Sequence, residues 1–368
     1  MEALLKYLEI VIEYRQEKKI RHKLSDIILL VFMSSLSNAN EWIEIEIFGK
    51  EHEEFLRNYL ELSNGIPSHD TIQRVFAMID PEYIQGFRQQ WQELLNKDEG
   101  QKIRKLLALD GKTQRGNGNQ HQKANHIVSA VDENGICIGE KLVDEKSNEI
   151  PAIPELLAML NVKHHIITID AMGTQKEIAA QIRKKRADYV LALKKNHGDL
   201  HEDVSFYFSD PDQLSKSAYK KTVEKARGGI EKREYWQTDD IAWLHQKKEW
   251  SGLKSIAMTR NTIIKNGRET TETRYFISSL PQDANEISRA IRGHWMVESY
   301  HWHLDVTFRD DDNRTLEKQA AYNLNIMKKL ALNVLKVIDI GKKSLSLAKK
   351  RFTICTNPQK HLQYIFSF

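Results

Sequence analysis

Two short apolar runs in the middle of the chain, residues 106–109 and 166–169, are each followed directly by an aspartate. An apolar run of this length between polar residues is typical of a strand that is buried on both faces of a sheet. Five further patterns complete the order β, β, β, α, β, α, β, with strands at 126–131, 136–143 and 189–193 and helices at 150–160 and 174–185. This order predicts an α/β fold, a mixed sheet with helices packed on it.

The flanking sequence predicts three further regions. Residues 1–96 form an all-helical N-terminal domain, in which Ser68 is the expected N-cap of a helix after a turn, an arrangement compatible with DNA binding or with any small bundle. The core occupies residues 104–205, is interrupted by a β-rich insertion at 206–282 with a hairpin turn at Asn266-Gly267, and resumes at 283–368 with a long helix and a helical tail.

Composition excludes several classes of protein. The 368 residues suffice for two or three domains of ~100–200 residues, and 40% hydrophobic with 29% charged residues is an ordinary globular balance. The longest apolar run, residues 27–33, is far shorter than the ~20 residues of a membrane span, and the start of the chain has no signal pattern. Two cysteines provide neither a disulfide framework nor a metal cluster, so we expect a cytoplasmic protein.

Three acidic residues are candidates for one site. Asp110 and Asp170 are predicted at the carboxyl ends of two strands of one sheet, where ligand sites gather, although either could be an ordinary turn residue. The third, Glu298, lies on the helix predicted at 285–305. On a helical wheel it falls within roughly 60° of three further polar side chains, His294, His301 and Asp305, in a stripe that apolar residues flank on both sides. This embedded stripe predicts either a buried structural cluster or a metal site.

Carboxylate oxygens are the ligands that hard cations such as Mg²⁺ and Mn²⁺ prefer. Two such ions could activate a water or a 3′-hydroxyl and stabilise the leaving oxygen in phosphoryl transfer. The segment Gly111-Lys112-Thr113 lacks the rest of a Walker loop, so ATP is not indicated, and no cysteine or third histidine completes a zinc site.

The net charge of +4 conceals basic clusters near the acids. Such clusters can neutralise DNA phosphates without reading sequence, although an isolated surface lysine is usually only solvated. The candidate DNA-binding residues are Lys112, Arg115, Arg183, Lys184, Lys185, Lys194, Lys195, Arg227 and Arg233.

Several segments, in this order along the chain, resemble the DDE transposases of bacterial insertion sequences, in particular the group that includes Rhs-linked H-repeat-associated proteins. The segments are Gly65-Ile66-Pro67-Ser68-His69-Asp70-Thr71, Leu109-Asp110-Gly111-Lys112-Thr113, Lys146-Ser147-Asn148-Glu149-Ile150-Pro151-Ala152-Ile153-Pro154, Thr168-Ile169-Asp170-Ala171-Met172-Gly173, Tyr189-Val190-Leu191-Ala192-Leu193-Lys194, Ile277-Ser278-Ser279-Leu280, His294-Trp295-Met296-Val297-Glu298 and His301-Trp302-His303-Leu304-Asp305-Val306. They extend from about residue 20 to residue 340.

The resemblance implies a ribonuclease H-like catalytic core, with Asp110, Asp170 and Glu298 as the metal-binding triad for two Mg²⁺ or Mn²⁺ ions. It also implies cleavage of double-stranded DNA at element ends, joining to target DNA, assembly as a homodimer on DNA and a place at the bacterial nucleoid, with no membrane association. The supporting polar residues of the third helix would be His294, His301 and Asp305.

The chain departs from the family pattern at three places. Arg227-Gly228-Gly229 replaces the usual His-Gly-Arg, Lys195-Asn196-His197 replaces Gly-Asn-Gln, and Ser299-Tyr300 replaces Asn-Leu. None of these changes removes a predicted metal ligand. They leave two alternatives, a decayed or co-opted protein that binds DNA without cutting it, and a ribonuclease H-like nuclease without strand transfer.

Overall fold

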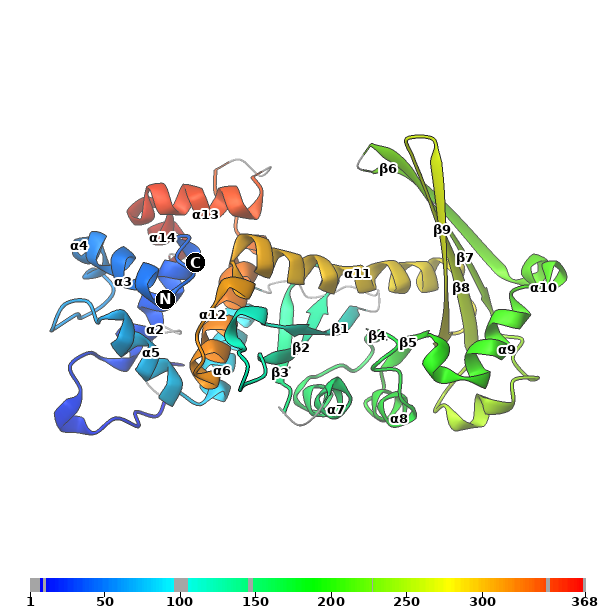
Figure 1. Ribbon diagram of the computed structural model, residues 1–368, viewed down its shortest axis with the longest axis horizontal. Coiled ribbons are helices and arrows are strands. Elements are labelled where there is room, and N and C mark those ends of the chain that lie inside the picture. Colours follow the sequence, from blue (N-terminus) through cyan, green and yellow to red (C-terminus); the bar gives the residue numbers. More distant parts are fainter. Residues whose placement is uncertain are drawn as a thin grey trace.

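One nine-stranded mixed sheet extends through the middle and one end of the molecule, in the order β3-β2-β1-β4-β5-β9-β8-β7-β6 (Figure 1). The computed structural model describes residues 7–8, 11–95, 105–144, 148–226, 228–341 and 345–366. The strands are β1 (Leu106–Thr113), β2 (His126–Asp132), β3 (Cys137–Leu142), β4 (Ile166–Ile169), β5 (Asp188–Leu193), β6 (Ala218–Ala226), β7 (Gly229–Thr238), β8 (Ser255–Lys265) and β9 (Arg268–Ser278).

The first five strands form the core half of the sheet. Strand β4 lies parallel between β1 and β5, and β2 and β3 extend the sheet in antiparallel pairing from β1. Helices α7 (Glu149–Met159) and α8 (Lys176–Lys184) cover one face, and the long helix α11 (Ala284–Thr307) crosses the other (Figure 1). Successive side chains of β1 point to opposite faces of the sheet. Leu107 packs in the core beneath α7 and α8, and Leu106 packs in the core beneath α11. The predicted element order is confirmed.

Strand β1 continues beyond Asp110, so the prediction that it ends there is wrong. Its parallel pairing with β4 does end at Leu109, opposite Ile169. The antiparallel pairing with β2 then continues to Thr113, opposite His126. The chain therefore stays extended after Asp110 because one neighbouring strand still supplies hydrogen-bond partners.

The insertion continues the core sheet, because β9 pairs with β5 along its edge. Two helices, α9 (Asp199–Tyr207) and α10 (Pro211–Lys216), precede four antiparallel strands, whose far ends project as an arm (Figure 1). Asn266 and Gly267 both have positive φ, 52° and 73°, as the predicted hairpin turn requires. Strand β6 is not predicted from the sequence, because most of its side chains are exposed and it has little apolar alternation.

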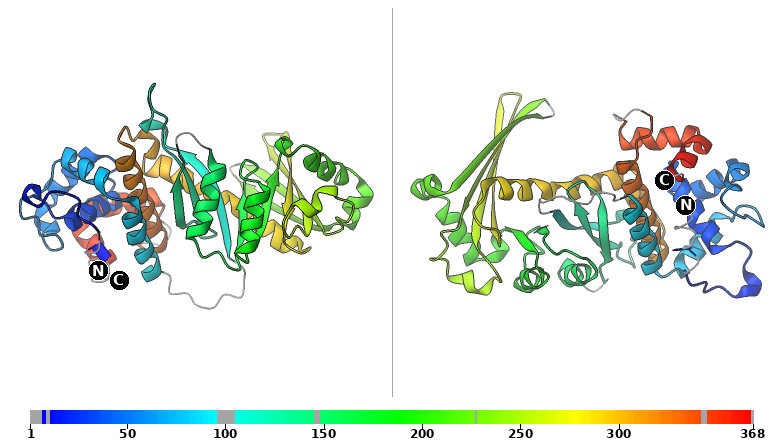
Figure 2. Two further views of the ribbon diagram at one scale, coloured as in Figure 1. Left: turned by 90° about the horizontal axis from the view of Figure 1, so that it is seen from below. Right: turned by 180° about the vertical axis from the view of Figure 1, so that it is seen from behind.

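The helices of the N-terminal region pack around a helix from the other end of the chain, α12 (Lys318–Val337) (Figure 2). Ser68 accepts a hydrogen bond from the backbone N–H of Thr71, as predicted for the cap of α5. The remaining helices are α2 (Leu24–Leu36), α3 (Trp42–Glu51), α4 (Glu53–Leu56), α5 (His69–Met78), α6 (Pro81–Leu95), α13 (Leu347–Thr356) and α14 (Pro358–Phe366), with 3₁₀ turns η1 (Glu17–Lys19), η2 (Arg115–Asn117), η3 (Lys195–His197), η4 (His245–Glu249) and η5 (Asp310–Asp312).

The predicted final core region, 283–368, therefore divides in the structure. Helix α11 lies on the sheet, whereas α12 and α13 pack with the N-terminal helices. Within the described ranges, no helix is both long enough and apolar enough to span a membrane.

Candidate active site

Asp110 and Asp170 are neighbours on adjacent parallel strands. Each is the next residue after the last parallel pair, Leu109 with Ile169. Because the chain turns away after β4, Oδ1 of Asp170 accepts hydrogen bonds from the backbone N–H groups of Met172 at 3.1 Å and Gly173 at 3.2 Å. These bonds orient the Asp170 carboxylate at the strand end.

Helix α11 follows β1 in the same direction, and two polar contacts hold it there. Nδ1 of His301 lies 3.5 Å from Oδ2 of Asp110, and Nζ of Lys112 lies 2.6 Å from Oδ1 of Asp305. Four helical residues advance about 6 Å and two strand residues about 6.6 Å, so the two contacts have matching spacing. Glu298 lies about one turn before His301 on the same helix.

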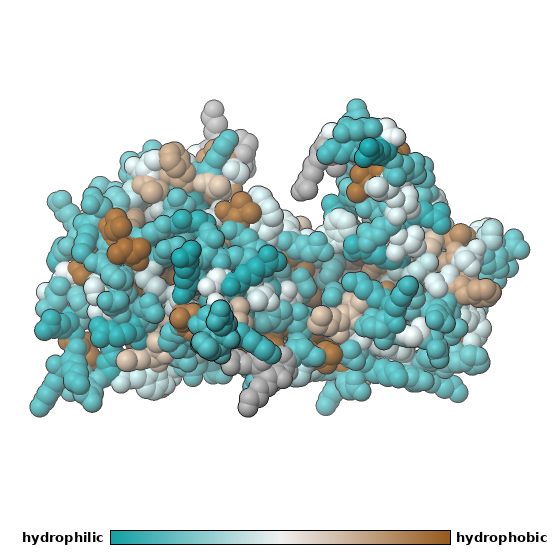
Figure 3. Space-filling model, in the orientation of Figure 1, coloured by the Kyte–Doolittle hydropathy of each residue, from teal (hydrophilic) through white to brown (hydrophobic). Residues whose placement is uncertain are grey.

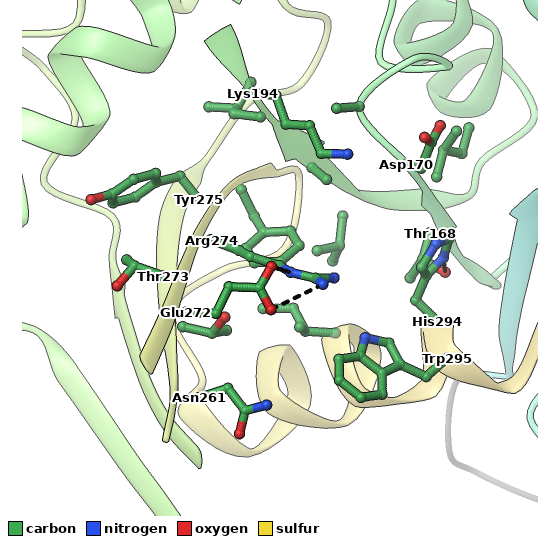
Figure 4. Close-up of a pocket in the computed structure, with 18 of the residues that line it drawn as sticks. Thr168, Asp170, Lys194, Asn261, Glu272, Thr273, Arg274, Tyr275, His294 and Trp295 are labelled. Atoms are coloured by element: carbon green, nitrogen blue, oxygen red, sulfur yellow. Dashed lines mark hydrogen bonds and ion pairs between the residues drawn. The ribbon is translucent and has the colours of Figure 1, made fainter. Parts of the chain in front are cut away.

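His294 lies on α11 further toward the start of the strands. Its Nδ1 is 3.0 Å from the hydroxyl of Thr168 on β4 (Figure 4). Burial lowers the pKa of His294, while the negative charges of Asp110, Glu298 and Asp170 act in the opposite direction. All three carboxylates are therefore close enough to act electrostatically on one imidazole.

The three carboxylates line one pocket of about 860 Å³ together with His294. Basic side chains from β5, the insertion and α11 line the same pocket, namely Lys194, Lys195, Arg233, Arg260, Arg274 and Arg292. Figure 4 shows Arg274 bonded to Glu272 in the middle of this pocket. Trp295 lies between two of the arginines, with ring-centroid distances of 5.5 Å to Arg274 and 5.1 Å to Arg292. The pocket lining therefore contains both acidic and cationic side chains.

Glu298 is exposed, so the prediction that its whole stripe is embedded in an apolar face is wrong. Helix α11 buries the neighbouring residues Val297, Tyr300 and Leu304 and leaves Glu298 at the rim of the pocket. Trp302, predicted to flank the stripe as an apolar residue, is 55% exposed. A carboxylate at the rim keeps its hydration and needs no buried partner.

The donor set fits a hard divalent cation, because three carboxylates from two strands and one helix line a single pocket. Among the residues that the structure describes, no three histidine, cysteine, aspartate or glutamate side chains stand close enough to hold a metal ion as they are placed. The three carboxylate side chains would therefore have to come closer together to hold an ion.

Two of the predicted DNA-binding residues near Asp110 differ in exposure. Lys112 has a side chain only 10% exposed and pairs with Asp305 and with Asp311, at 2.8 Å. Burial lowers the pKa of Lys112, but the surrounding carboxylates outweigh it and the pKa is raised above its ordinary value. Arg115, in contrast, is highly exposed and 3.8 Å from Asp311.

The basic residues of α8 lie outside the pocket. Arg183 pairs with Asp188, and Lys185 donates hydrogen bonds to the carbonyl groups of Ala158 and Leu160 at 3.0 and 2.8 Å, close to the end of α7. Lys184 is exposed on the same helix.

Only part of the predicted basic set lines the pocket: Lys194, Lys195 and Arg233. Arg233 is paired there with Glu224 at 3.0 Å and with Glu231. Arg227 lies outside the described residues. The pocket lining also includes five residues that were not predicted as site residues: Thr168, Arg260, Arg274, Arg292 and Trp295. The i, i+3 spacing of Trp295 and Glu298 is the one local signal that could have indicated a shared face.

Residues 101–334 match the family described as a transposase DDE domain, and residues 5–92 match the family described as DDE_Tnp_1-associated. The chain belongs to the DDE transposase family. This confirms the resemblance inferred from the ordered motifs.

Several relatives of this DDE transposase cover most of its length. A protein of Escherichia coli O157:H7 named "Putative transposase YncI" is 40% identical over 91% of this chain and 88% of its own. The "H repeat-associated putative transposase YhhI" of Escherichia coli K12 is 37% identical over 91% of this chain and 90% of its own. A short K12 protein named "Inactive transposase YbfQ" is 47% identical over 21% of this chain and 92% of its own.

Proposed function

We propose that this transposase cleaves DNA at the ends of an insertion sequence and joins those ends to target DNA, with Asp110, Asp170 and Glu298 as its catalytic residues. The observation that carries the proposal is the position of the two aspartates beside each other after the last parallel pair of β1 and β4. The sheet order β3-β2-β1-β4-β5, with β2 antiparallel, supports a ribonuclease H-like core.

Asp110, Asp170 and Glu298 would hold two Mg²⁺ or Mn²⁺ ions. When bound, such ions supply Lewis-acid stabilisation of the attacking and leaving oxygens in phosphoryl transfer. Asp170 is held for this task by two backbone N–H groups, and Asp110 by His301. His294 fills the space behind the carboxylates and keeps its Nδ1 on Thr168.

The cationic part of the pocket would bind the phosphates beside the scissile bond. Lys194 and Lys195 lie at the end of β5, two strands from Asp110, whereas Arg233, Arg260 and Arg274 belong to the insertion and Arg292 to α11. Figure 3 shows a wide hollow between the helical end of the molecule and the arm, with a largely hydrophilic surface on both sides. We assign double-stranded DNA to this side of the molecule and recognition of the element ends to the N-terminal helices. Two ends require two active sites, so the working unit is a homodimer on DNA at the bacterial nucleoid.

The test uses the full chain, DNA carrying the terminal repeats that flank its gene, and Mg²⁺ or Mn²⁺. Asp110→Asn, Asp170→Asn and Glu298→Gln should each lower cleavage by roughly 10³-fold or more, with DNA affinity retained. Glu177→Gln is the matched control, because Glu177 is an exposed acid on α8, on the opposite face of the sheet. Cleavage by any triad variant at the wild-type rate would refute the site.

The reaction products distinguish a transposase from a nuclease and from a DNA-binding protein without catalysis. Joined strands support a transposase, whereas cleavage without joining supports a nuclease. DNA binding without cleavage by the wild-type chain supports a binding protein that has lost catalysis.

A further inference from the structure

We infer that Lys112 and Asp305 are positioning residues whose ion pair sets how far along β1 helix α11 sits, and with it the place of Glu298 relative to Asp110. The inference deepens the proposed function and rests on it, because it concerns the same carboxylates.

The contact is short, and its lysine is largely shielded from solvent. Nζ of Lys112 lies 2.6 Å from Oδ1 of Asp305 and 2.8 Å from Oδ1 of Asp311, and the lysine side chain is 10% exposed. Asp310, which is fully buried, lies 3.9 Å from the same amine. Three carboxylates therefore surround one ammonium group, which leaves Lys112 little freedom to bind a DNA phosphate. Removing the lysine charge would leave three carboxylates without their shared counter-charge, which is costly for the buried Asp310.

The surrounding acids are themselves anchored. Asp310 accepts hydrogen bonds from Nε2 of Gln114 at 3.1 and 3.2 Å and from Nδ2 of Asn325 at 2.9 Å, and it lies 3.6 Å from Nζ of Lys328. Gln114 follows β1 directly, whereas Asn325 and Lys328 belong to α12. The end of α11 is thus fastened to the end of β1 and to the helical half of the molecule at one point.

The spacing of the contacts explains why this fastening matters for Glu298. Lys112 is two residues after Asp110 on the same face of β1, and Asp305 is four residues after His301 on α11. These separations, about 6.6 Å and about 6 Å, agree, so both contacts form together. A slip of α11 by one turn, about 5.4 Å, would break both and carry Glu298 away from the aspartates.

A contact nearer the start of α11 shows the same register. A Cβ atom at Gly293 would stand 2.7 Å from Cδ1 of Leu106, so the helix lies directly on the first residue of β1. Apolar packing of this kind holds the helix close but is non-directional. The ion pair of Lys112 and Asp305 joins one point of α11 to one point of β1.

The experiment measures Mn²⁺ affinity of the full chain by electron paramagnetic resonance, without DNA, alongside DNA affinity, cleavage and melting temperature. The variants are Lys112→Met, Asp305→Asn and the charge-conserving Lys112→Arg. Lys141→Met is the matched control, since Lys141 on β3 pairs at 2.8 Å with Glu155 on α7, another strand-to-helix ion pair, on the other side of the sheet.

We expect Lys112→Met and Asp305→Asn to weaken Mn²⁺ binding roughly tenfold and to lower the cleavage rate, with DNA affinity unchanged. Lys112→Arg should keep most of the Mn²⁺ affinity and of the cleavage rate, and Lys141→Met should change neither quantity. Should Lys112→Met fail to fold, Asp305→Asn, which keeps the amine paired with Asp311, carries the test. Unchanged Mn²⁺ affinity in a folded variant overturns the inference, as does a loss confined to DNA affinity, which would make Lys112 a DNA contact.

Asp110→Asn separates this outcome from failure of the proposed function. If Asp110→Asn leaves Mn²⁺ binding intact, the triad itself is wrong. If Asp110→Asn abolishes Mn²⁺ binding while Lys112→Met does not affect it, only the positioning role is wrong.

Discussion

Asp110 and Asp170 stand side by side because each follows the last residue that pairs β1 with β4 in parallel. After this point the two strands separate, β1 continuing along β2 and β4 turning into the loop that begins at Asp170. The carboxylates therefore lie where β1 and β4 separate. On the opposite face of the sheet, side chains pack closely against the backbone next to Asp110.

Gly111→Ala tests this crowding. A Cβ atom at Gly111 would stand 2.1 Å from Oε1 of Glu149 and 2.6 Å from Nε2 of His126, which are themselves 2.7 Å apart. We expect Gly111→Ala to lower the free energy of unfolding by about 1–3 kcal/mol in urea titrations and to slow cleavage, because β1 must shift beside Asp110. Adding Glu149→Ala should recover part of the stability. Equal stability of the single variant and the wild type would contradict the crowding.

Lys329→Met tests a buried charge cluster behind the site. Nζ of Lys329 pairs with Glu140 and is 2.9 Å from the hydroxyl of Ser129, the cross-strand partner of Asp110. Arg88 holds the other oxygen of Glu140 at 2.9 Å. Removing one partner of a buried pair should cost about 3–5 kcal/mol of unfolding free energy, measured in urea. Lys360→Met, at an exposed position on α14, should stay within about 0.5 kcal/mol of the wild type.

Salt dependence of DNA binding distinguishes the basic residues. Lys194→Ala and Lys195→Ala should weaken binding and lower the slope of log K against log salt by about one each, since each removes a predicted phosphate contact. Lys185→Ala should leave both unchanged, because Lys185 donates to carbonyl groups near the end of α7. A reduced slope for Lys185→Ala would restore that residue to the DNA-binding set.

Acid unfolding tests Glu46, which joins α3 to α5. Hydrogen bonds from Lys50 and from the backbone and ring of His69 lower the pKa of Glu46 from 4.5 to about 2. Because the pKa of Glu46 is lower in the folded state than in the unfolded state, its ionised carboxylate stabilises the folded protein above about pH 4.5. This stabilisation is lost as the pH falls from about 4.5 to about 2. Glu46→Gln should therefore be less stable than the wild type by about 1–2 kcal/mol at pH 7, after allowing for solvent screening. The difference should vanish near pH 2, and a gap that persists there would contradict this account.

Local patterns predicted the parts of the molecule that are decided within one strand or helix. The apolar runs before Asp110 and Asp170 correctly indicated two buried strands of one sheet, because burial on two faces marks a central parallel strand regardless of its partners. The order of the core elements, the hairpin turn at Asn266-Gly267 and the cap at Ser68 follow from equally local chemistry.

Contacts between distant residues decided the rest. Helical periodicity at Glu298 could not show which side of α11 meets the pocket, since that depends on how the helix crosses the sheet. Likewise, a cluster of lysines and arginines in the sequence does not show which of them is already paired.

The sequence by itself determined the element order, the three candidate carboxylates and membership of the transposase family. Only the tertiary structure decided that Lys112 faces acids instead of solvent, that Glu298 stands at an exposed rim, and that α12 shares its core with the N-terminal helices. Lys112 and Asp311 are 199 residues apart in the chain, and no local propensity reports a contact at that separation. Such pairs form only when the packing of whole elements brings their side chains together.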